Sequence, residues 1–515
     1  SDLRADAQRK GHGQVWYAVC ARADADGRVV EEARVQLPGD PILGEGKPEN
    51  QNMALPFAHG EKLQLIDMNQ AGYFEEALKM RCLLEEFEPP QRSKPGPITI
   101  VGFPEHVFTQ SSGFVTAFFI AMQEHYFCSL VQRVLDEPLD IRLHYGHPDL
   151  LDKLHFATRG GVSKASKEIN LSEDVFAGFK TTNAGGAVAF REYHLVGKGR
   201  PTNLMEINGF FAKLASGAAA ACSTRDVHRF ASALPLVRLL SYYYSSLAFY
   251  LHDVIVLHVT LLMPYLLSTL ALLDIDHEFN SYLSDSLSLV ALLPLLIATV
   301  SCVPSFAMVV YERGYKAAGN FLIGMLLTVS PVYFIFIAQT KSYHFARTVA
   351  FGGARYFTPQ RNASVLHTTF HELYALFAPS HFFVAVDVAF MLSIAHVWSV
   401  SPRLLQATWA TWSLVFCFYS APFLYNPQAF ELPFLLDDLS RLHDWLRHGG
   451  WDSWHRAASA ASSSALSAPE HAWNSQFTLA ARAFFYGFVA TYIRIKARAP
   501  DSVALGYVVY GRFTV

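Results

Sequence analysis

The sequence predicts an α/β domain followed by a bundle of transmembrane helices. Residues 1 to 230 mix charged and apolar side chains and are broken by glycine and proline, whereas charges become sparse beyond about residue 240. The chain has 515 residues, of which 51% are hydrophobic and 17% are charged, and the apolar residues are concentrated in the second half. We therefore expect a soluble domain over residues 1–235 and a membrane domain over residues 236–515.

The first half alternates short strands with helices, which is typical of an α/β domain. The run ITIVGF (98–103) is apolar and β-branched, and LDIRLHYG (139–146) resembles a second strand. Residues 71–88 have helical spacing. On that helix, the side chains expected to face the core are Phe74, Ala77, Leu78 and Cys82.

The second half contains stretches that reach the roughly 20 apolar residues of a membrane span. The stretches without an acidic residue, lysine or arginine cover about 254–273, 286–311, 317–340 and 404–430. Two weaker ones cover 380–401, interrupted by Asp387, and 477–493, interrupted by Arg482. Four such runs in one half favour about five or six transmembrane helices over the buried helices of a large soluble protein.

A different helix is expected near 431–447, between the spans. Its leucines recur at helical spacing, while most of its charged residues lie elsewhere on the helix, which is typical of a helix in the membrane interface. The leucines are Leu435, Leu439, Leu442 and Leu446.

Charge and cysteine content exclude several classes of protein. A formal net charge of −3 does not indicate a nucleic-acid binder, which would carry a basic stripe or domain. The six cysteines are far apart and form no CxxC pair, which argues against a disulfide framework or a zinc site.

Glycines and cations recur together at three places in the first half, one of which is TRGGVSK (158–164). GEGKP (44–48) and GKGRPT (197–202) fail as a P-loop and as a dinucleotide motif, because proline or threonine stands where a required residue belongs. Glycine-rich backbone beside a cation can still bind a phosphate ester. The cations concerned are Lys47, Lys164, Lys198 and Arg200, and ordinary turns with solvated side chains are the alternative.

Carboxylates form a second set of candidates. A sugar-nucleotide transferase needs one carboxylate for the nucleotide or a metal and another to take the proton of the attacking hydroxyl. Cations must offset the charge that grows on the leaving diphosphate. The candidate acids are Asp67, Asp149, Glu173 and Asp174, each of which could alternatively be a helix cap or a surface residue.

Five segments together resemble the catalytic region of 1,3-β-glucan (callose) synthases. They are LPGDPILGEGKPENQN, GEKLQLIDMNQAGYFEEALKMRCLLEEF, HYGHPDLLDKLHFATRGGVSKASKEINLSEDVFAGF, EYHLVGKGR and FGGARY. The resemblance implies a cytosolic domain similar to the glycosyltransferase-A fold, joined to membrane helices. It also implies an integral protein of the plasma membrane that takes glucose from UDP-glucose, inverts the anomeric centre and extrudes a β-1,3-linked chain.

The same resemblance implies roles for individual residues. Asp174 would be the base that deprotonates the acceptor, with Glu173 as second choice, and Lys198 and Arg200 would stabilise the leaving UDP. Lys47, Asn50 and Asp67 fall in segments expected around the uridine end, and Asp149 and Lys164 are further substrate-binding candidates. No DxD metal motif is present, so we predict no metal ligand; the resemblance leaves room for a divalent cation such as Mg²⁺.

Partners are also implied by the resemblance: UDP-glucose, the growing glucan, membrane lipid and the small regulatory GTPase with which family members often associate. One departure from the family pattern favours an alternative. Ala219, Ala220 and Ala221 stand where a polar Gly-Glu-Gln stretch is usual. The alternative is an inactive paralogue or fragment that acts as a scaffold or regulatory part of a synthase complex.

Overall fold

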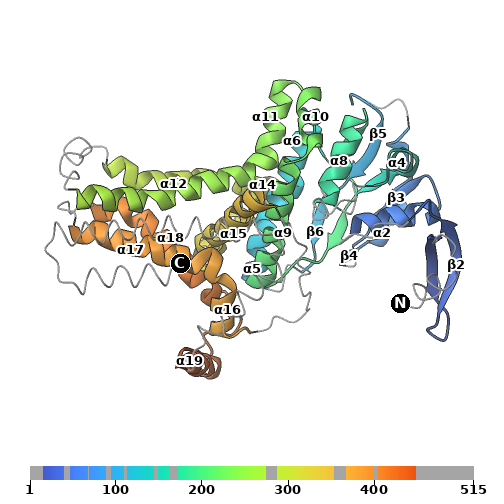
Figure 1. Cartoon of the computed structure of the whole chain (residues 1–515). Coiled ribbons are helices and arrows are strands. Elements are labelled where there is room, and N and C mark those ends of the chain that lie inside the picture. The colour runs from blue at the N-terminus through green and yellow to red at the C-terminus, as the bar shows by residue number, and fades with distance from the viewer. Residues whose placement is uncertain are drawn as a thin grey trace.

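The computed structural model is mostly helical (Figure 1). It contains two small sheets, each with both parallel and antiparallel strand pairs, and a separate hairpin. Helices α12, α15, α17 and α18 pack together on one side of the molecule, and the sheets lie on the other side. The structure describes residues 15–39, 47–67, 69–88, 94–109, 113–143, 146, 149–162, 172–273, 287–352, 367–398 and 404–447.

The larger sheet has the strand order β3-β7-β5-β8. Its strands are β3 (Lys62–Gln64), β7 (Leu150–Asp152), β5 (Ile98–Gly102) and β8 (Ala187–Phe190). β5 runs antiparallel to β7 and parallel to β8. All five residues of β5 are buried, as expected for the continuous apolar run of a central strand. The predicted strand over 98–103 is therefore confirmed.

The second sheet has the order β4-β9-β6 and carries several of the candidate residues. Its strands are β4 (Gln70–Ala71), β9 (Val196–Lys198) and β6 (Glu105–Val107). Only two residues, 103 and 104, separate β5 from β6, so the chain passes directly from the first sheet into the second. A separate antiparallel hairpin is formed by β1 (Tyr17–Ala23) and β2 (Val29–Gln36).

Two local predictions were wrong. The described part of 139–146 forms no strand: Asp140 has a positive φ of 50°, and its carboxylate accepts a hydrogen bond from the ammonium group of Lys94 at 2.9 Å. Residues 71–88 form two short helices, and Phe74 and Leu78 are 77% and 70% exposed. The helix breaks at Lys79, and the buried residue of the second helix is Leu83. Cys82, which was predicted to face the core, is exposed.

The helices of the first half include two long ones, α8 and α9. The set is α2 (Lys47–Ala54), the 3₁₀ turn η1 (Leu55–Phe57), α3 (Phe74–Leu78), α4 (Met80–Glu85), α5 (Phe114–Ile120), the π-helix η3 (Ala121–Val131), α6 (Gln132–Asp136), α7 (Lys153–Ala157), α8 (Glu173–Asn183), α9 (Leu204–Cys222), α10 (Arg225–Ala233) and α11 (Leu236–Ser245).

The helices of the second half are longer and more apolar. They are α12 (Leu247–Leu272), α14 (Leu287–Leu327), α15 (Ser330–Phe351), α16 (Phe370–Phe377), the π-helix η4 (Ala378–Phe382), α17 (Phe383–Trp398), α18 (Leu404–Leu424) and α19 (Leu432–Arg447). The predicted stretches 254–273 and 380–401 correspond to α12 and to η4 with α17, and α18 covers most of 404–430. The predicted span over 477–493 lies outside the described residues.

Three helices among the described residues are long and apolar enough to cross a membrane, judged by length and composition. They are Phe114–Asp136, Phe249–Leu272 and Ala378–Trp398. A fourth candidate is a bent pair, Thr299–Leu327 with Ser330–Phe351, whose two parts meet at 74°. The sequence reasoning missed Phe114–Asp136, because that segment lies in the more polar half of the chain.

The bent pair differs from the two spans that were predicted over 286–311 and 317–340. Gly314 interrupts α14 with non-helical angles, which agrees with the predicted break. A second break falls inside the predicted span, where Val329 is left-handed with φ 55° and Pro331 occupies the first turn of α15. Proline has no N–H and favours the first turn of a new helix rather than the continuation of an old one.

A hydrophobic cluster joins the two halves of the chain. It contains Phe118 of α5, Ile207 and Phe211 of α9, and Phe336 of α15, all of which are buried. Figure 1 shows α5 and α9 between the sheets and the long helices. The boundary at residue 235 therefore remains a prediction.

Helix α19 is present where an interfacial helix was predicted. It meets α16, and its buried Asp438 lies 2.9 Å from a ring nitrogen of His367. The exposed apolar residues of α19 are Leu432, Leu436 and Leu439, a slightly different stripe from the predicted one. Its position in a membrane interface remains a prediction.

Candidate active site

Lys198 and Arg200 lie in a buried cluster with two carboxylates. The ammonium group of Lys198 is 3.0 Å from Asp67 and 3.3 Å from Glu105. The guanidinium of Arg200 donates to the other oxygen of Glu105. All four side chains are at least 86% buried, with Asp67 the most exposed at 14%.

The second sheet explains how residues so far apart in the sequence meet. Lys198 ends β9, where it pairs with Gln70 of β4 on one side and Val107 of β6 on the other. Asp67 precedes β4 and Glu105 begins β6, so each neighbouring strand brings one carboxylate to the same lysine. The structure thus brings together three of the predicted site residues, Asp67, Lys198 and Arg200.

Arg200 also connects the cluster to the helices. Its guanidinium lies 5.8 Å from the ring centre of Phe119 in α5 and 5.4 Å from that of Phe210 in α9. Its backbone N–H donates to the hydroxyl of Thr109 at 3.2 Å. These contacts hold a planar cation against aromatic faces, which favours a fixed orientation.

Glu105 is the residue of this cluster that sequence reasoning missed. Burial raises the pKa of its carboxyl, but Arg200 and Lys198 lower it by more, so the pKa is held below its ordinary value. Glu105 is therefore ionised at neutral pH, and the formal charges of the two cations and two carboxylates cancel. A signal was present in the sequence, since an acidic residue directly follows the predicted strand ITIVGF and its Phe-Pro turn.

The Gly160-Gly161 turn, at the start of the predicted glycine-rich segment, contacts two helices. The side-chain oxygen of Asn52 in α2 accepts a hydrogen bond from the Val162 N–H at 2.8 Å, and Lys180 of α8 donates to both glycine carbonyls at 3.2 Å. Gly161 has φ +93°, and a Cβ there would lie 2.2 Å from the Asn52 oxygen. The turn at residues 160–162 is therefore held between α2 and α8.

Four predicted residues belong to these segments. Lys47 begins α2, Asn50 is exposed on the same helix, and Glu173 and Asp174 are the first two residues of α8. Carboxylates at a helix N-terminus are stabilised by the helix dipole, so this position alone would suit a structural role as well as a catalytic one. Glu173 is 3% exposed, and Asp174 is half-buried. Lys164 and the side chain of Lys47 lie outside the described residues.

Asp149 is placed in the interior of the larger sheet. Its carboxylate is 3.5 Å from the guanidinium of Arg142, and both side chains have no exposed surface. Arg142 also donates to the carbonyl of Ala189 at 3.3 Å. Gly102 leaves room for this guanidinium, since a Cβ there would come within 2.1 Å of it.

Ala219, Ala220 and Ala221, where the resemblance led us to expect a polar stretch, lie near the end of α9. Ala219 packs beside Phe345 of α15, and Ala221 packs in another cluster with Phe179 and Phe230. Both are at most 1% exposed. An uncompensated polar side chain would be costly at either position, whereas alanine fits the packed interior and favours the helix.

No group of three or more His, Cys, Asp or Glu residues within the described ranges has the arrangement of a metal site. The cluster around Lys198 instead combines cations with carboxylates that hold them in place. Chemically, such an arrangement can bind and neutralise an anionic group once one of the carboxylates gives way.

Comparison with known proteins gives a consistent result. The sequence model described as "1,3-beta-glucan synthase component" matches residues 3–468. Callose synthase 9 of Arabidopsis thaliana is 39% identical over 471 residues, which are 87% of this chain and 25% of that protein. Callose synthase 7 of the same plant is 38% identical over 465 residues, or 86% of this chain and 23% of that protein. The chain thus spans about a quarter of the length of the curated relatives that it matches.

Proposed function

Because the chain belongs to the 1,3-β-glucan synthase family, we propose that it is the catalytic portion of a membrane-embedded inverting glycosyltransferase. This enzyme polymerises glucose from UDP-glucose into β-1,3-glucan and extrudes the product. The observation that carries the proposal is the buried cluster of Lys198, Arg200, Asp67 and Glu105.

In the proposed reaction, Lys198 and Arg200 receive the diphosphate of the donor. Their charge is balanced by Asp67 and Glu105 before the donor binds. Asp67 is the more exposed carboxylate, 14% against 2% for Glu105. Donor binding therefore moves Asp67 away from Lys198 and toward the uridine end, while Glu105 stays and orients both cations.

The transfer step is a displacement at the anomeric carbon. The acceptor hydroxyl oxygen bonds to C1 of the glucosyl unit while the bond from C1 to the β-phosphate oxygen breaks, and UDP leaves with that electron pair. Asp174 takes the proton of the hydroxyl, and Lys198 and Arg200 offset the charge on UDP. Glu173 is the second choice for the base.

The remaining predicted residues belong to the donor side of this proposal. The contact of Asn52 with the glycine turn supports a shared role for α2 and the glycine-rich segment, which contain Lys47, Asn50 and Lys164. The burial of Asp149 against Arg142 supports an indirect role, in which it holds the sheet that carries the site rather than contacting the donor.

The proposed setting is the plasma membrane, with the transferase site on the cytoplasmic face. A glycosyltransferase-A-like domain over 1–235 and five or six transmembrane helices over 236–515 would serve this purpose. The partners are UDP-glucose, the growing glucan, membrane lipid and a small regulatory GTPase, and a divalent cation such as Mg²⁺ is compatible with the chemistry. Two of the candidate spans among the described residues, Phe249–Leu272 and Ala378–Trp398, lie in the proposed membrane domain and support the membrane location.

A scaffold or regulatory part of a synthase complex is the second candidate. The apolar packing of Ala219 and Ala221 favours it, because positions that are expected to be polar in the family are here occupied by alanines in the hydrophobic interior. An inactive paralogue of this kind would keep the fold and the cation cluster without turnover.

One experiment separates the two candidates. The chain, joined to the remaining portion found in its relatives and purified in detergent, is given labelled UDP-glucose. Polymer that an endo-β-1,3-glucanase digests supports the synthase. Binding of UDP-glucose without polymer supports the scaffold, and no binding at all contradicts the proposed donor.

A further inference from the structure

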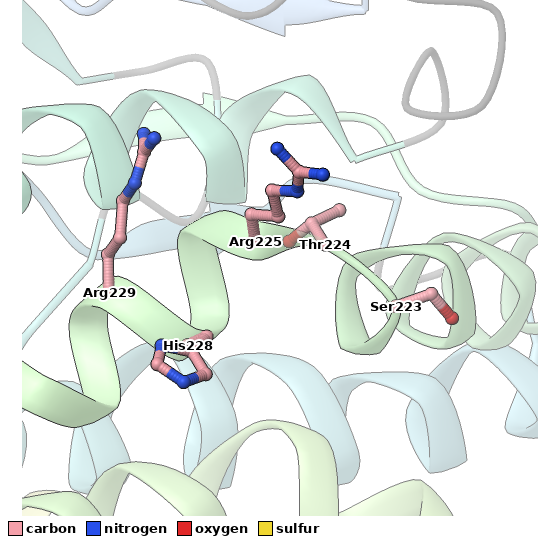
Figure 2. A pocket seen from close by; sticks show the side chains of 5 residues that line it. All are labelled: Ser223, Thr224, Arg225, His228 and Arg229. Atoms are coloured by element: carbon pink, nitrogen blue, oxygen red, sulfur yellow. The ribbon is translucent and has the colours of Figure 1, made fainter.

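A cationic hollow lies where α9 ends and α10 begins. It has a volume of about 410 Å³, which is within the range of small-ligand sites. Its lining consists of Ser223, Thr224, Arg225, His228 and Arg229 (Figure 2).

Two arginines dominate this hollow. Arg225 and Arg229 are one helical turn apart, and Figure 2 shows both side chains extending from the same side of α10. Like charges at this spacing destabilise an isolated helix slightly. Asp226 lies 3.5 Å from Arg229, so this pair offsets one of the two charges. Arg225, His228 and Arg229 are all exposed.

The start of α10 adds backbone donors. Thr224 is the N-cap residue, but its hydroxyl donates to the carbonyl of Ala221 at 2.9 Å and caps no N–H of α10. The first N–H groups of α10 thus have no side-chain cap, and Thr224 and Arg225 at this end of the helix both line the hollow. Arginine pairs and helix N-termini both favour phosphate, and a guanidinium can bind two phosphate oxygens at once.

The neighbouring helix α11 indicates where such a phosphate would come from. Five apolar residues of α11 are exposed at spacings that place them on one face: Leu236, Val237, Leu240, Tyr243 and Tyr244. The candidate span Phe249–Leu272 begins four residues after the end of α11. An exposed apolar helix face that includes tyrosines, directly before a span, is typical of a membrane interface.

The hollow is separate from the cluster around Lys198. That cluster lies near the start of α9, since Arg200 precedes Leu204 by four residues, and the hollow lies beyond its end. A helix of 19 residues is roughly 28 Å long. A ligand in the hollow would therefore not be the diphosphate that Lys198 receives.

We propose that this hollow binds the phosphate of an anionic lipid headgroup, with Arg225 and Arg229 as its ligands and the apolar face of α11 in the headgroup layer. The inference rests on the proposed membrane location but not on transferase activity. Lipid binding at this place would fix the start of the first long helix of the second half relative to the bilayer surface.

The test is lipid retention by the full chain in neutral detergent, measured by native mass spectrometry with phosphatidylglycerol or phosphatidylcholine. We expect the wild-type chain to prefer phosphatidylglycerol and the double variant Arg225→Gln/Arg229→Gln to lose affinity for it by about thirtyfold. The matched control is Arg22→Gln/Arg81→Gln, because those side chains are 70% and 89% exposed and lie on other elements. The control should retain the lipid.

Three outcomes would overturn the proposal. The first is equal retention of phosphatidylglycerol by the double variant and the control. The second is binding of inorganic phosphate without binding of the lipid, which would assign the hollow to a free phosphate. The third is a loss of UDP-glucose binding in the double variant, which would make the hollow part of the donor site. If the wild-type chain binds the lipid but no UDP-glucose, the proposed function fails and the lipid site stands.

Discussion

The ammonium group of Lys198 lies 3.0 Å from a carboxylate oxygen of Asp67, with Glu105 at 3.3 Å on another strand. A lysine that already meets two carboxylates can offer its charge to a diphosphate only when one of them moves. This relationship underlies the first two predictions.

Replacing Lys198 by alanine should weaken UDP-glucose binding and lower kcat by about 10²–10³, the usual cost of losing a group that stabilises developing charge. Binding is measured by calorimetry and turnover by release of UDP. Lys316→Ala is the matched control, because Lys316 is exposed in α14. Unchanged kinetics in the Lys198 variant would refute its role.

Glu105→Gln should reduce kcat more than it raises KM, because both cations remain but are no longer held by a charged partner. A misplacement of about 1 Å at a reacting group costs roughly a hundredfold. The control Glu88→Gln changes an exposed carboxylate. A change in KM alone would indicate that Glu105 contributes to ground-state binding only.

Stability should also depend on pH through Glu105. Its pKa in the folded protein is lowered by Arg200 and Lys198 against the opposing effect of burial. The unfolded chain therefore binds this proton first as the pH falls. The stabilisation is complete above the ordinary carboxyl pKa and is lost as the pH falls through the lower folded value. Thermal unfolding of wild type and Glu105→Gln between pH 7 and about pH 3 should converge at the acidic end, and parallel curves would contradict this.

Asp149→Ala should destabilise the protein by about 3–5 kcal/mol, because it leaves the guanidinium of Arg142 buried without its carboxylate. Thermal unfolding measures this, with exposed Asp437→Ala as control. The double variant Arg142→Met/Asp149→Leu should recover much of the loss, since an apolar pair of similar size avoids the buried charge. A stable Asp149→Ala variant that fails to bind UDP-glucose would instead establish direct donor binding.

Asp174→Asn should abolish turnover while donor binding is retained. A general base contributes typically 10²–10⁴ to the rate, and asparagine keeps the shape of the side chain but cannot take the proton. Glu173→Gln is the neighbouring control, and it should keep most activity if Asp174 is the base. If Glu173→Gln abolishes turnover and Asp174→Asn does not, Glu173 is the base instead.

Gly161→Ala should destabilise the glycine turn by about 1–3 kcal/mol through backbone strain. Its φ of +93° disfavours alanine, and the new Cβ would meet the Asn52 oxygen at 2.2 Å. Gly72→Ala is the control, because that glycine has an ordinary φ and open space around its Cα. Hydrogen exchange at Val162 reports the loss of its bond to Asn52, and equal protection in both variants would show that the turn tolerates the change.

The sequence by itself determined the family, the buried strand at Ile98–Gly102 and the apolar helices α12, α17 and α18. These features depend on local patterns: short sequence motifs, runs of β-branched residues and uninterrupted apolar stretches. The same local patterns predicted that Lys198 and Arg200 would be important, because glycine beside a cation is visible along the chain.

Only the tertiary structure decided which of the candidates meet. The strand order β4-β9-β6 brings Asp67 and Glu105 to Lys198, and strand order is set by pairing between distant segments rather than by neighbours in the sequence. The structure also shows that Asp149 is buried whereas Asn50 is exposed, although both belong to polar motifs. A residue's type and spacing are properties of the chain, whereas its charge partners and exposure come from packing. The sequence therefore identified Asp67, Lys198 and Arg200 as candidates, but only the structure shows which carboxylates pair with Lys198 and that Arg142 pairs with Asp149.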